Sequence, residues 1–220
     1  MVRPDKTRGR TPNIALSVDG TPAAGRFAPV FKSEGARPEA PMGELFHPHY
    51  VTLRDGRAAL IRRAEPRDAK SIIDHVNEVG AEQVYIMTEQ LDKTVAEEDD
   101  FLRTLDPRAT LYLVAIVNGQ LVASADIHRG KFAKNAHTAS LGIAVRKLVR
   151  GQGLGKAIMV DMIGWARSEG VRKVTLGVFA TNESAIALYR ELGFTEEGRL
   201  RGEVMLAGRP VDQVLMALWL

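Results

Sequence analysis

Residues 144–156 read AVRKLVRGQGLGK, and this stretch decides the fold. Three glycines at alternate positions follow an apolar run that ends at Val145 and precede the first turn of an expected helix. Glycine lacks the Cβ atom that would keep a phosphate away from the backbone, and a helix N-terminus offers unpaired N–H groups with a positive dipole end. We therefore expect an anion site here, with Arg150 and Lys156 adding charge suited to a pyrophosphate.

Two other nucleotide-binding motifs differ from this loop at fixed positions. A Walker A loop needs a glycine five residues before its Gly-Lys pair and Ser or Thr after it, but the chain has Arg150 and Ala157 there. A Rossmann GxGxxG that starts at Gly151 needs glycine where the chain has Lys156. The spacing excludes both motifs. A plain tight turn is the structural alternative, although one glycine usually suffices for a turn.

Composition is that of a soluble globular protein with one main domain. The chain has 220 residues, of which 45% are hydrophobic and 26% charged. No apolar run approaches the ~18 residues of a membrane span, and no apolar stretch follows the basic start as in a secretory signal. We expect a cytoplasmic protein without a membrane partner. The lack of cysteine excludes disulfides, thiolate-bound zinc and a thioester on the protein, so group transfer must be direct and no metal is expected.

The basic charge is confined to the N-terminal part. The formal net charge of +3 arises within residues 1–40, so the remainder is neutral. Nucleic-acid binding needs a basic face on the folded part, so we expect no nucleic-acid partner, and only a contact through the tail stays open.

The chain divides at about residue 48. Residues 1–48 are rich in Pro, Gly, Ala and Arg without helical or strand periodicity, which predicts a mobile extension. The alternative is an arm that packs on a partner subunit through apolar side chains, namely Phe27, Val30, Phe31 and Phe46. Residues 49–220 are predicted to form the functional domain.

Hydrophobic patterns in this domain predict a mixed sheet with flanking helices, an α/β (α+β) fold. Asp55-Gly56 and Asn118-Gly119 each lie between apolar segments and predict two hairpins. The predicted helices cover residues 65–80, 89–105, 154–170 and 181–193, with glycines at three of the ends. The other predicted strands lie near residues 111–117, 121–127, 137–145, 173–179, 195–205 and 211–219, the last two separated by Gly208-Arg209-Pro210.

Residues 150–155 match the pattern Arg/Gln-x-x-Gly-x-Gly/Ala and resemble the acyl-CoA pyrophosphate loop of the GNAT superfamily of N-acetyltransferases. TNESAIALYRELGF at 181–194 resembles the superfamily segment Asn-x-x-Ala-x-x-Leu-Tyr-x-x-x-Gly-Phe. LGIAV at 141–145 resembles its splayed strand, and LIRRAEPRDA at 60–69 its first strand and helix entry. The resemblance covers about residues 57–219. It implies a mostly antiparallel sheet with a splayed pair of strands and flanking helices.

The resemblance also implies acetyl-CoA as co-substrate, with its pantetheine arm between residues 143–145 and the strand at 175–179. Gly142 fits a bulge beside this gap, and an N–H of Ile143 or a neighbour is the expected oxyanion donor. The implied cofactor-binding residues are Ile143, Ala144, Val145, Arg150, Gly151, Gln152, Gly153, Leu154, Gly155, Lys156, Asn182, Ser184 and Tyr189.

Acetyl transfer to an amine needs two proton movements: the ammonium must lose a proton before it attacks, and the thiolate is best protonated as it leaves. The resemblance suggests a group for the second. Tyr189 resembles the tyrosine that protonates the leaving thiolate in many of these enzymes. A phenol with a pKa near 10 is protonated at neutral pH and can donate. The alternative is that Tyr189 only packs on the buried face of its helix.

The general base is less clearly marked. Ribosomal-protein N-terminal acetyltransferases carry a glutamate where this chain has His137, and histone-type relatives carry theirs where it has Ala139. His137 is a candidate because an imidazole titrates near neutral pH, and a solvent-facing histidine without chemistry is the alternative. Glu82 lies where substrate-binding loops of the family often carry acids, so it is a second candidate. A bound water, Glu89 and His128 are further options.

Residues 137–145 and 196–220 look most like acetyltransferases of amino acids or related small amines. The implied function is acetyl transfer from acetyl-CoA to a small-molecule amine. The alternatives are the N-terminus of a ribosomal or other protein as acceptor, and a non-catalytic CoA-binding module. A homodimer is the commonest soluble oligomer, but the sequence leaves open the oligomeric state, the acceptor and the acyl chain length.

Overall fold

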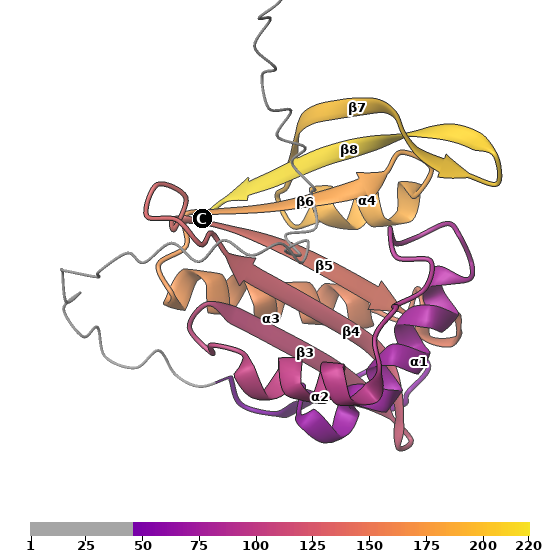
Figure 1. The fold of residues 1–220 in the computed structure, drawn as a ribbon, viewed down its shortest axis with the longest axis vertical. Coiled ribbons are helices and arrows are strands. Elements are labelled where there is room, and N and C mark those ends of the chain that lie inside the picture. Colours follow the sequence, from indigo (N-terminus) through magenta and orange to yellow (C-terminus); the bar gives the residue numbers. More distant parts are fainter. Residues whose placement is uncertain (1–45) are drawn as a thin grey trace, which may run out of the picture. The chain divides into compact units, whose positions relative to one another are not determined.

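A computed structural model describes residues 46–220 of the chain (Figure 1). The predicted extension falls almost wholly outside these residues, and so do three of the four side chains assigned to a partner-binding arm. The fourth, Phe46, packs against the core beside His49, with 5.6 Å between the ring centroids. No helix within residues 46–220 combines the length and the apolar character that crossing a membrane requires.

The described residues form an eight-stranded sheet in the order β1-β2-β3-β4-β5-β6-β8-β7. All neighbouring strands are antiparallel except β5 and β6, which confirms the predicted mixed, mostly antiparallel fold. The elements are β1 (His49–Thr52), β2 (Ala58–Arg63), the short 3₁₀ helix η1 (Pro66–Asp68), α1 (Ala69–Gly80), α2 (Val95–Thr104), β3 (Thr110–Val117), β4 (Gln120–Arg129), β5 (Thr138–Val145), η2 (Lys147–Val149), α3 (Leu154–Ser168), β6 (Lys173–Phe179), α4 (Glu183–Glu191), β7 (Thr195–Leu206) and β8 (Arg209–Trp219).

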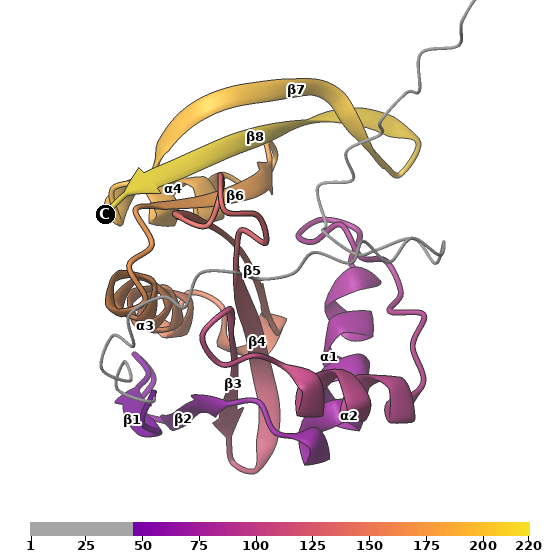
Figure 2. The ribbon, with the colours of Figure 1, turned by 60° about the vertical axis from the view of Figure 1, so that its left-hand side comes forward.

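Helices cover both faces of the central strands. Figure 2 shows α1 and α2 on one side of β3, β4 and β5, and α3 on the other side. Side chains alternate along a strand, so Ala123, Ala125 and Ile127 of β4 enter the larger core on the α3 side. The residues between them face α1 and α2, where a smaller core forms around Ile72 and Val114.

Both predicted hairpins are present. Asn118 and Gly119 have φ +50° and +79°, as a tight Asn-Gly hairpin requires, whereas the β1–β2 loop covers residues 53–57 and only Gly56 there, at φ +87°, has a positive φ. The C-terminal turn was predicted one position late. It is formed by Ala207 and Gly208, while Pro210 lies inside β8 opposite Met205.

The second helix begins at Val95, so the predicted start near residue 89 is wrong. Thr94 is its N-cap: the Thr94 hydroxyl accepts a bond from the Glu97 N–H at 3.2 Å, and the Glu97 carboxylate accepts one from the Thr94 N–H at 2.8 Å. This Thr-x-x-Glu capping box is visible in the sequence and was overlooked. Residues 81–94 therefore form a loop.

Strands β5 and β6 separate after a short parallel contact, which confirms the splayed pair. They pair from Thr138–Ser140 to Lys173–Thr175 and not beyond. β5 follows β4 as far as Val145, while β6 follows β8 as far as Phe179, so each strand keeps its outer neighbour (Figure 1). The expected bulge at Gly142 is wrong, because the β4–β5 register runs past this residue without a shift. The gap results from strand divergence.

Candidate functional site

The loop before α3 has the geometry of an anion cradle. Gly151 and Gly153 have φ +72° and +91°, and a Cβ added to either would meet no atom within 4 Å. Backbone conformation therefore requires glycine here, and the space beside the loop is open. Gly153 is the N-cap of α3 without a side-chain capping bond, and the first turn contains no acidic residue. The first N–H groups of α3 are thus available to an anion.

Gly155 differs from the other two glycines. It lies inside α3, its φ is not positive, and an added Cβ would be 3.7 Å from Leu188 Cδ2, an ordinary contact. Alanine therefore fits at this position, in agreement with the Gly/Ala alternative of the motif.

The β1–β2 hairpin supports the cradle from behind. Arg54 donates its backbone N–H to the Gln152 carbonyl at 3.1 Å and its Nη1 to the Gly151 carbonyl at 3.1 Å. Arg57 donates its Nη2 to the Leu148 carbonyl at 3.1 Å. These bonds hold the loop carbonyls on the hairpin side. Sequence reasoning missed this support because Arg54 and Gly151 lie 97 positions apart.

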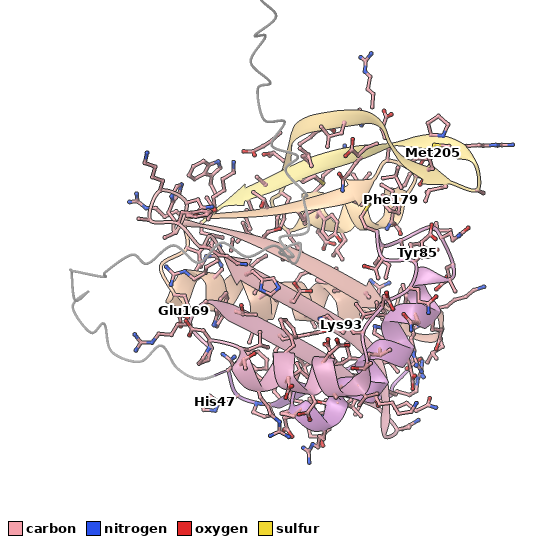
Figure 3. All side chains as sticks on the ribbon, viewed as in Figure 1. His47, Tyr85, Lys93, Glu169, Phe179 and Met205 are labelled. Atoms are coloured by element: carbon pink, nitrogen blue, oxygen red, sulfur yellow. The ribbon has the colours of Figure 1, made fainter. Side chains whose placement is uncertain are left out.

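Arg150, predicted to bind the pyrophosphate, is held by the loop between α1 and α2. Its guanidinium makes a bidentate ion pair with Glu82, with N–O distances of 2.7 and 2.5 Å, and its Nε donates to the Val145 carbonyl at 2.7 Å. The same group lies 4.0 Å from the ring centroid of Tyr85, which Figure 3 labels on this loop. Arg150 thus joins the end of β5, the cradle and residues 81–94.

Lys156, the other predicted cation, also has a carboxylate partner. Its Nζ lies 2.6 Å from Glu191 Oε1, and both side chains are about half exposed. The donors of the cradle that keep no partner among the described residues are therefore main-chain N–H groups. Lys156 lies at the open rim, where an anion from solvent can replace Glu191 as its partner.

Glu82, a predicted general base, is bound to Arg150. Hydrogen bonds and charge from Arg150 lower the pKa of Glu82, since they stabilise the carboxylate. An ionised acid that is already paired is poorly placed to remove a proton from an acceptor. The geometry favours a structural role for Glu82, which links the α1–α2 loop to the cradle through Arg150.

We expect Glu82→Gln to reduce the free energy of unfolding by about 1 kcal/mol, because the ion pair is only partly buried. The kcat should change by less than about tenfold, whereas loss of a general base costs about 10²- to 10⁴-fold. Denaturant unfolding and steady-state kinetics measure both. Glu78→Gln, which removes the partner of Arg146, is the matched control. A hundredfold loss of kcat only in Glu82→Gln would identify it as the base.

Tyr189 lies on the buried face of α4, where its ring centroid is 6.0 Å from that of Phe194. Burial raises the pKa of Tyr189 to about 12, so the phenol is protonated at neutral pH. The neighbouring Asn182 is the N-cap of α4: its Oδ1 accepts bonds from the Ala185 N–H and the Ser184 hydroxyl, each at 3.2 Å. The side chains of Asn182 and Ser184 thus form the start of this helix.

His137 lies exposed in the turn before β5. Its carbonyl accepts bonds from the Arg172 and Lys173 N–H groups at 2.7 and 3.2 Å, which fixes this end of the sheet. The splay opens after Ser140, about 10 Å farther along a strand that rises ~3.3 Å per residue. His137 therefore lies at the closed end of the splay, and its role as base stays a prediction.

His75 of α1 is a buried group that sequence reasoning missed. It has no exposed surface, its Nε2 lies 3.3 Å from the Ala144 carbonyl of β5, and its Nδ1 has no hydrogen-bond partner. Burial, with help from the charges of Arg146 and Arg150, lowers the pKa of His75 to about 4. The imidazole is neutral in the folded state at physiological pH.

This histidine predicts acid sensitivity. Below pH 6.5 His75 is protonated in the unfolded chain, whereas in the folded chain it becomes protonated only near pH 4. The free energy of unfolding should therefore fall by about 3 kcal/mol between these values, at ~1.36 kcal/mol per pKa unit. Urea unfolding of wild type and His75→Gln, whose amide can still donate to Ala144, measures the effect. Equal pH dependence of the two proteins would contradict it.

Two further polar side chains, Asp126 and His128, lie at the splay. Sequence reasoning indicated His128 but not Asp126. On the side of α1 and α2, Asp126 Oδ2 and His128 Nε2 of β4 lie 2.7 Å apart. The Asp-x-His spacing puts both side chains on one face of a strand, a signal that could have found the pair. Within residues 46–220, no three His, Asp or Glu side chains gather as a metal site requires.

Comparisons with known proteins agree with this geometry. The model of the Acetyltransferase (GNAT) family matches residues 77–194. The L-amino acid N-acetyltransferase AaaT of Escherichia coli is 31% identical over 166 residues, 72% of this chain and 96% of that one. The [ribosomal protein bS18]-alanine N-acetyltransferase of Escherichia coli is 38% identical over 76 residues, 34% and 51% of the two chains. The structure of a GNAT superfamily phosphinothricin acetyltransferase from Sinorhizobium meliloti in complex with AcCoA has a TM-score of 0.67, at 25% identity over 74% and 88%.

Proposed function

This chain belongs to the GNAT family of acetyltransferases, and we propose that it moves an acetyl group from acetyl-CoA to the primary amine of a small molecule such as an amino acid. The observation that carries the proposal is the cradle: two glycines at positive φ beside open space, followed by the uncapped N-terminus of α3. A diphosphate is an anion that such N–H groups bind well.

The cradle and the splay together suit a long ligand. Main-chain N–H groups from Gly151 to Lys156 would hold the pyrophosphate, with Lys156 at the rim. The β5 edge from Leu141 to Val145 has no partner strand on the side of β6, so its main-chain groups can bond to a pantetheine arm. Acetyl-CoA supplies the activated acetyl group as a thioester.

Tyr189 is the residue that we assign to protonation of the leaving thiolate. Burial keeps its phenol protonated, and the hydroxyl makes no hydrogen bond with another residue of the described part of the chain. A protonated, unbonded donor is available to a thiolate that forms beside it.

The small-molecule acceptor is supported by the extent of the sequence matches. Similarity to an L-amino acid N-acetyltransferase runs through 96% of that enzyme, whereas similarity to the ribosomal-protein enzyme covers 51% of it. A protein N-terminus is the second candidate, because this match is the more identical of the two.

An acceptor screen tests the proposal. The full chain is incubated with acetyl-CoA and single amino acids, polyamines, aminoglycosides or a peptide with N-terminal alanine, and CoA release is followed with a thiol-detecting dye. Release with a free amino acid, with the acetylated product seen by mass spectrometry, would support the proposal. Release only with the peptide would favour the second candidate. Binding of acetyl-CoA without turnover of any amine would identify a non-catalytic module.

A further inference from the structure

Three polar side chains of β3 and β4, Asp126, His128 and Thr110, contact one another in series beside the splay. His128 Nε2 lies 2.7 Å from Asp126 Oδ2, and His128 Nδ1 lies 3.0 Å from the Thr110 hydroxyl. Both histidine nitrogens therefore have a partner, while the second carboxylate oxygen, Asp126 Oδ1, has none among residues 46–220. The Asp126 and His128 side chains are 38% and 42% exposed, so a ligand can reach them.

Strand register puts these three side chains where the splay opens. Asp126 is opposite Gly142 and His128 is opposite Ser140, the last β5 residue that pairs with β6. A Cβ added to Gly142 would lie 3.4 Å from Asp126 Oδ1, so the unbonded oxygen lies over the face of β5 at Gly142, where β5 no longer pairs with β6 and its edge is free. This is the edge on which the proposed function places the pantetheine arm.

The charges around Asp126 fit a cationic acceptor. Its neighbour His128 is charged only if protonated, and no Lys or Arg of the described residues forms an ion pair with Asp126, whereas Glu82 and Asp68 each have an arginine. On the neighbouring strand, burial and the negative charges of Asp126 and Glu98 raise the pKa of Tyr112. Glu98 on α2 is itself paired with Lys93 at 3.0 Å. Asp126 is thus left for an external cation.

We propose that Asp126 binds the ammonium group of the acceptor and takes up its proton, and that His128 and Thr110 position Asp126. The inference rests on the proposed function and names the group that receives the amine. Asp126 is the catalytic residue because it alone would touch the acceptor. His128 and Thr110 are positioning residues, since both nitrogens of His128 already lie within 3.0 Å of an oxygen of Asp126 or Thr110.

The step balances as follows. The ammonium donates a hydrogen bond to Asp126 Oδ1 and transfers one proton to the Asp126–His128 pair, which passes it to solvent. The neutral amine forms a bond to the acetyl carbon, the carbon–sulfur bond breaks, and the sulfur retains the electron pair. The sulfur takes up a proton, and the nitrogen loses its second one. An ammonium and acetyl-CoA thus give an amide, CoA thiol and one released proton.

The test compares Asp126→Asn with Asp74→Asn, a carboxamide exchange in an exposed ion pair on α1. With an acceptor found in the screen, we expect Asp126→Asn to lower kcat/KM for the amine about 100-fold, the usual scale for a lost base. The thermal shift given by acetyl-CoA should not change, which also verifies folding. The defect should shrink as pH rises, because more acceptor then loses its proton to solvent. Asp74→Asn should match the wild type.

The positioning role has its own readout. His128→Ala should lower kcat about tenfold and move the acidic limb of the pH–rate profile, whereas His128→Gln, which keeps a donor to Asp126, should restore most of the rate. Full activity of Asp126→Asn in an enzyme that binds acetyl-CoA and turns over would overturn the inference and leave the proposed function intact. A wild type that turns over no amine would overturn both.

Discussion

Gly153→Ala is expected to weaken acetyl-CoA binding about 100-fold. Gly153 has φ +91° as the N-cap of α3, a conformation that an L-residue disfavours by about 1–2 kcal/mol. Relaxation of that strain turns the first N–H groups of α3 away from the bound phosphate. Loss of one or two charge-assisted hydrogen bonds, at about 1.5–3 kcal/mol each, accounts for a hundredfold change. Isothermal titration with acetyl-CoA measures the dissociation constant.

Substitutions at two other glycines distinguish the loss of anion binding from the general effect of backbone strain. Gly119→Ala introduces the same kind of strain at φ +79° in the β3–β4 turn, with no atom within 4 Å of the new Cβ. It should lose similar stability and keep its acetyl-CoA affinity. Gly155→Ala should bind nearly as the wild type does, because its φ is not positive. If Gly153→Ala bound acetyl-CoA as tightly as Gly119→Ala, the N–H groups at the start of α3 would not hold the pyrophosphate.

Tyr189→Phe is the second change with a large expected effect: kcat should fall about 10²- to 10³-fold. The substitution removes only the hydroxyl, which forms no hydrogen bond with the described residues, so the ring keeps its place against Phe194. The free energy of unfolding should change little. Acetyl-CoA affinity should hold as well, because the lost group acts on the leaving thiolate. Steady-state kinetics and urea unfolding separate these quantities.

The packing interpretation of Tyr189 predicts a different result. If the ring only fills the core, Tyr189→Phe retains kcat within about threefold, and only Tyr189→Ala, which opens a cavity, loses stability and activity together. Tyr50→Phe, on a side chain that is 71% exposed on β1, controls for the exchange itself. If Tyr189 instead protonates the thiolate, the alkaline limb of the pH–rate profile should disappear in Tyr189→Phe, since no phenol remains to ionise.

Sequence by itself determined the elements whose causes are local. Glycines, which readily adopt positive φ, predicted the cradle and both hairpins. Alternation of apolar residues predicted the strands. Helical periodicity predicted α1, α3 and α4, and a capping box at Thr94 could have placed α2 correctly. The family follows from the same stretches, because the phosphate loop and the segment at 182–194 are continuous in the chain.

Only the tertiary structure decided what each candidate side chain contacts. Glu82 and Arg150 are 68 positions apart, so nothing local reveals that a predicted base and a predicted phosphate ligand neutralise each other. Asp126 lies beside Gly142 only because of the β4–β5 register. A register shift of one residue would move the Asp126 side chain to the opposite face of the sheet. Backbone conformation depends on near neighbours in the chain, but the partner of a charged group depends on the packing of distant segments. The sequence therefore determined the glycine loop before α3, and the fold alone brought Asp126 to the open end of the splay.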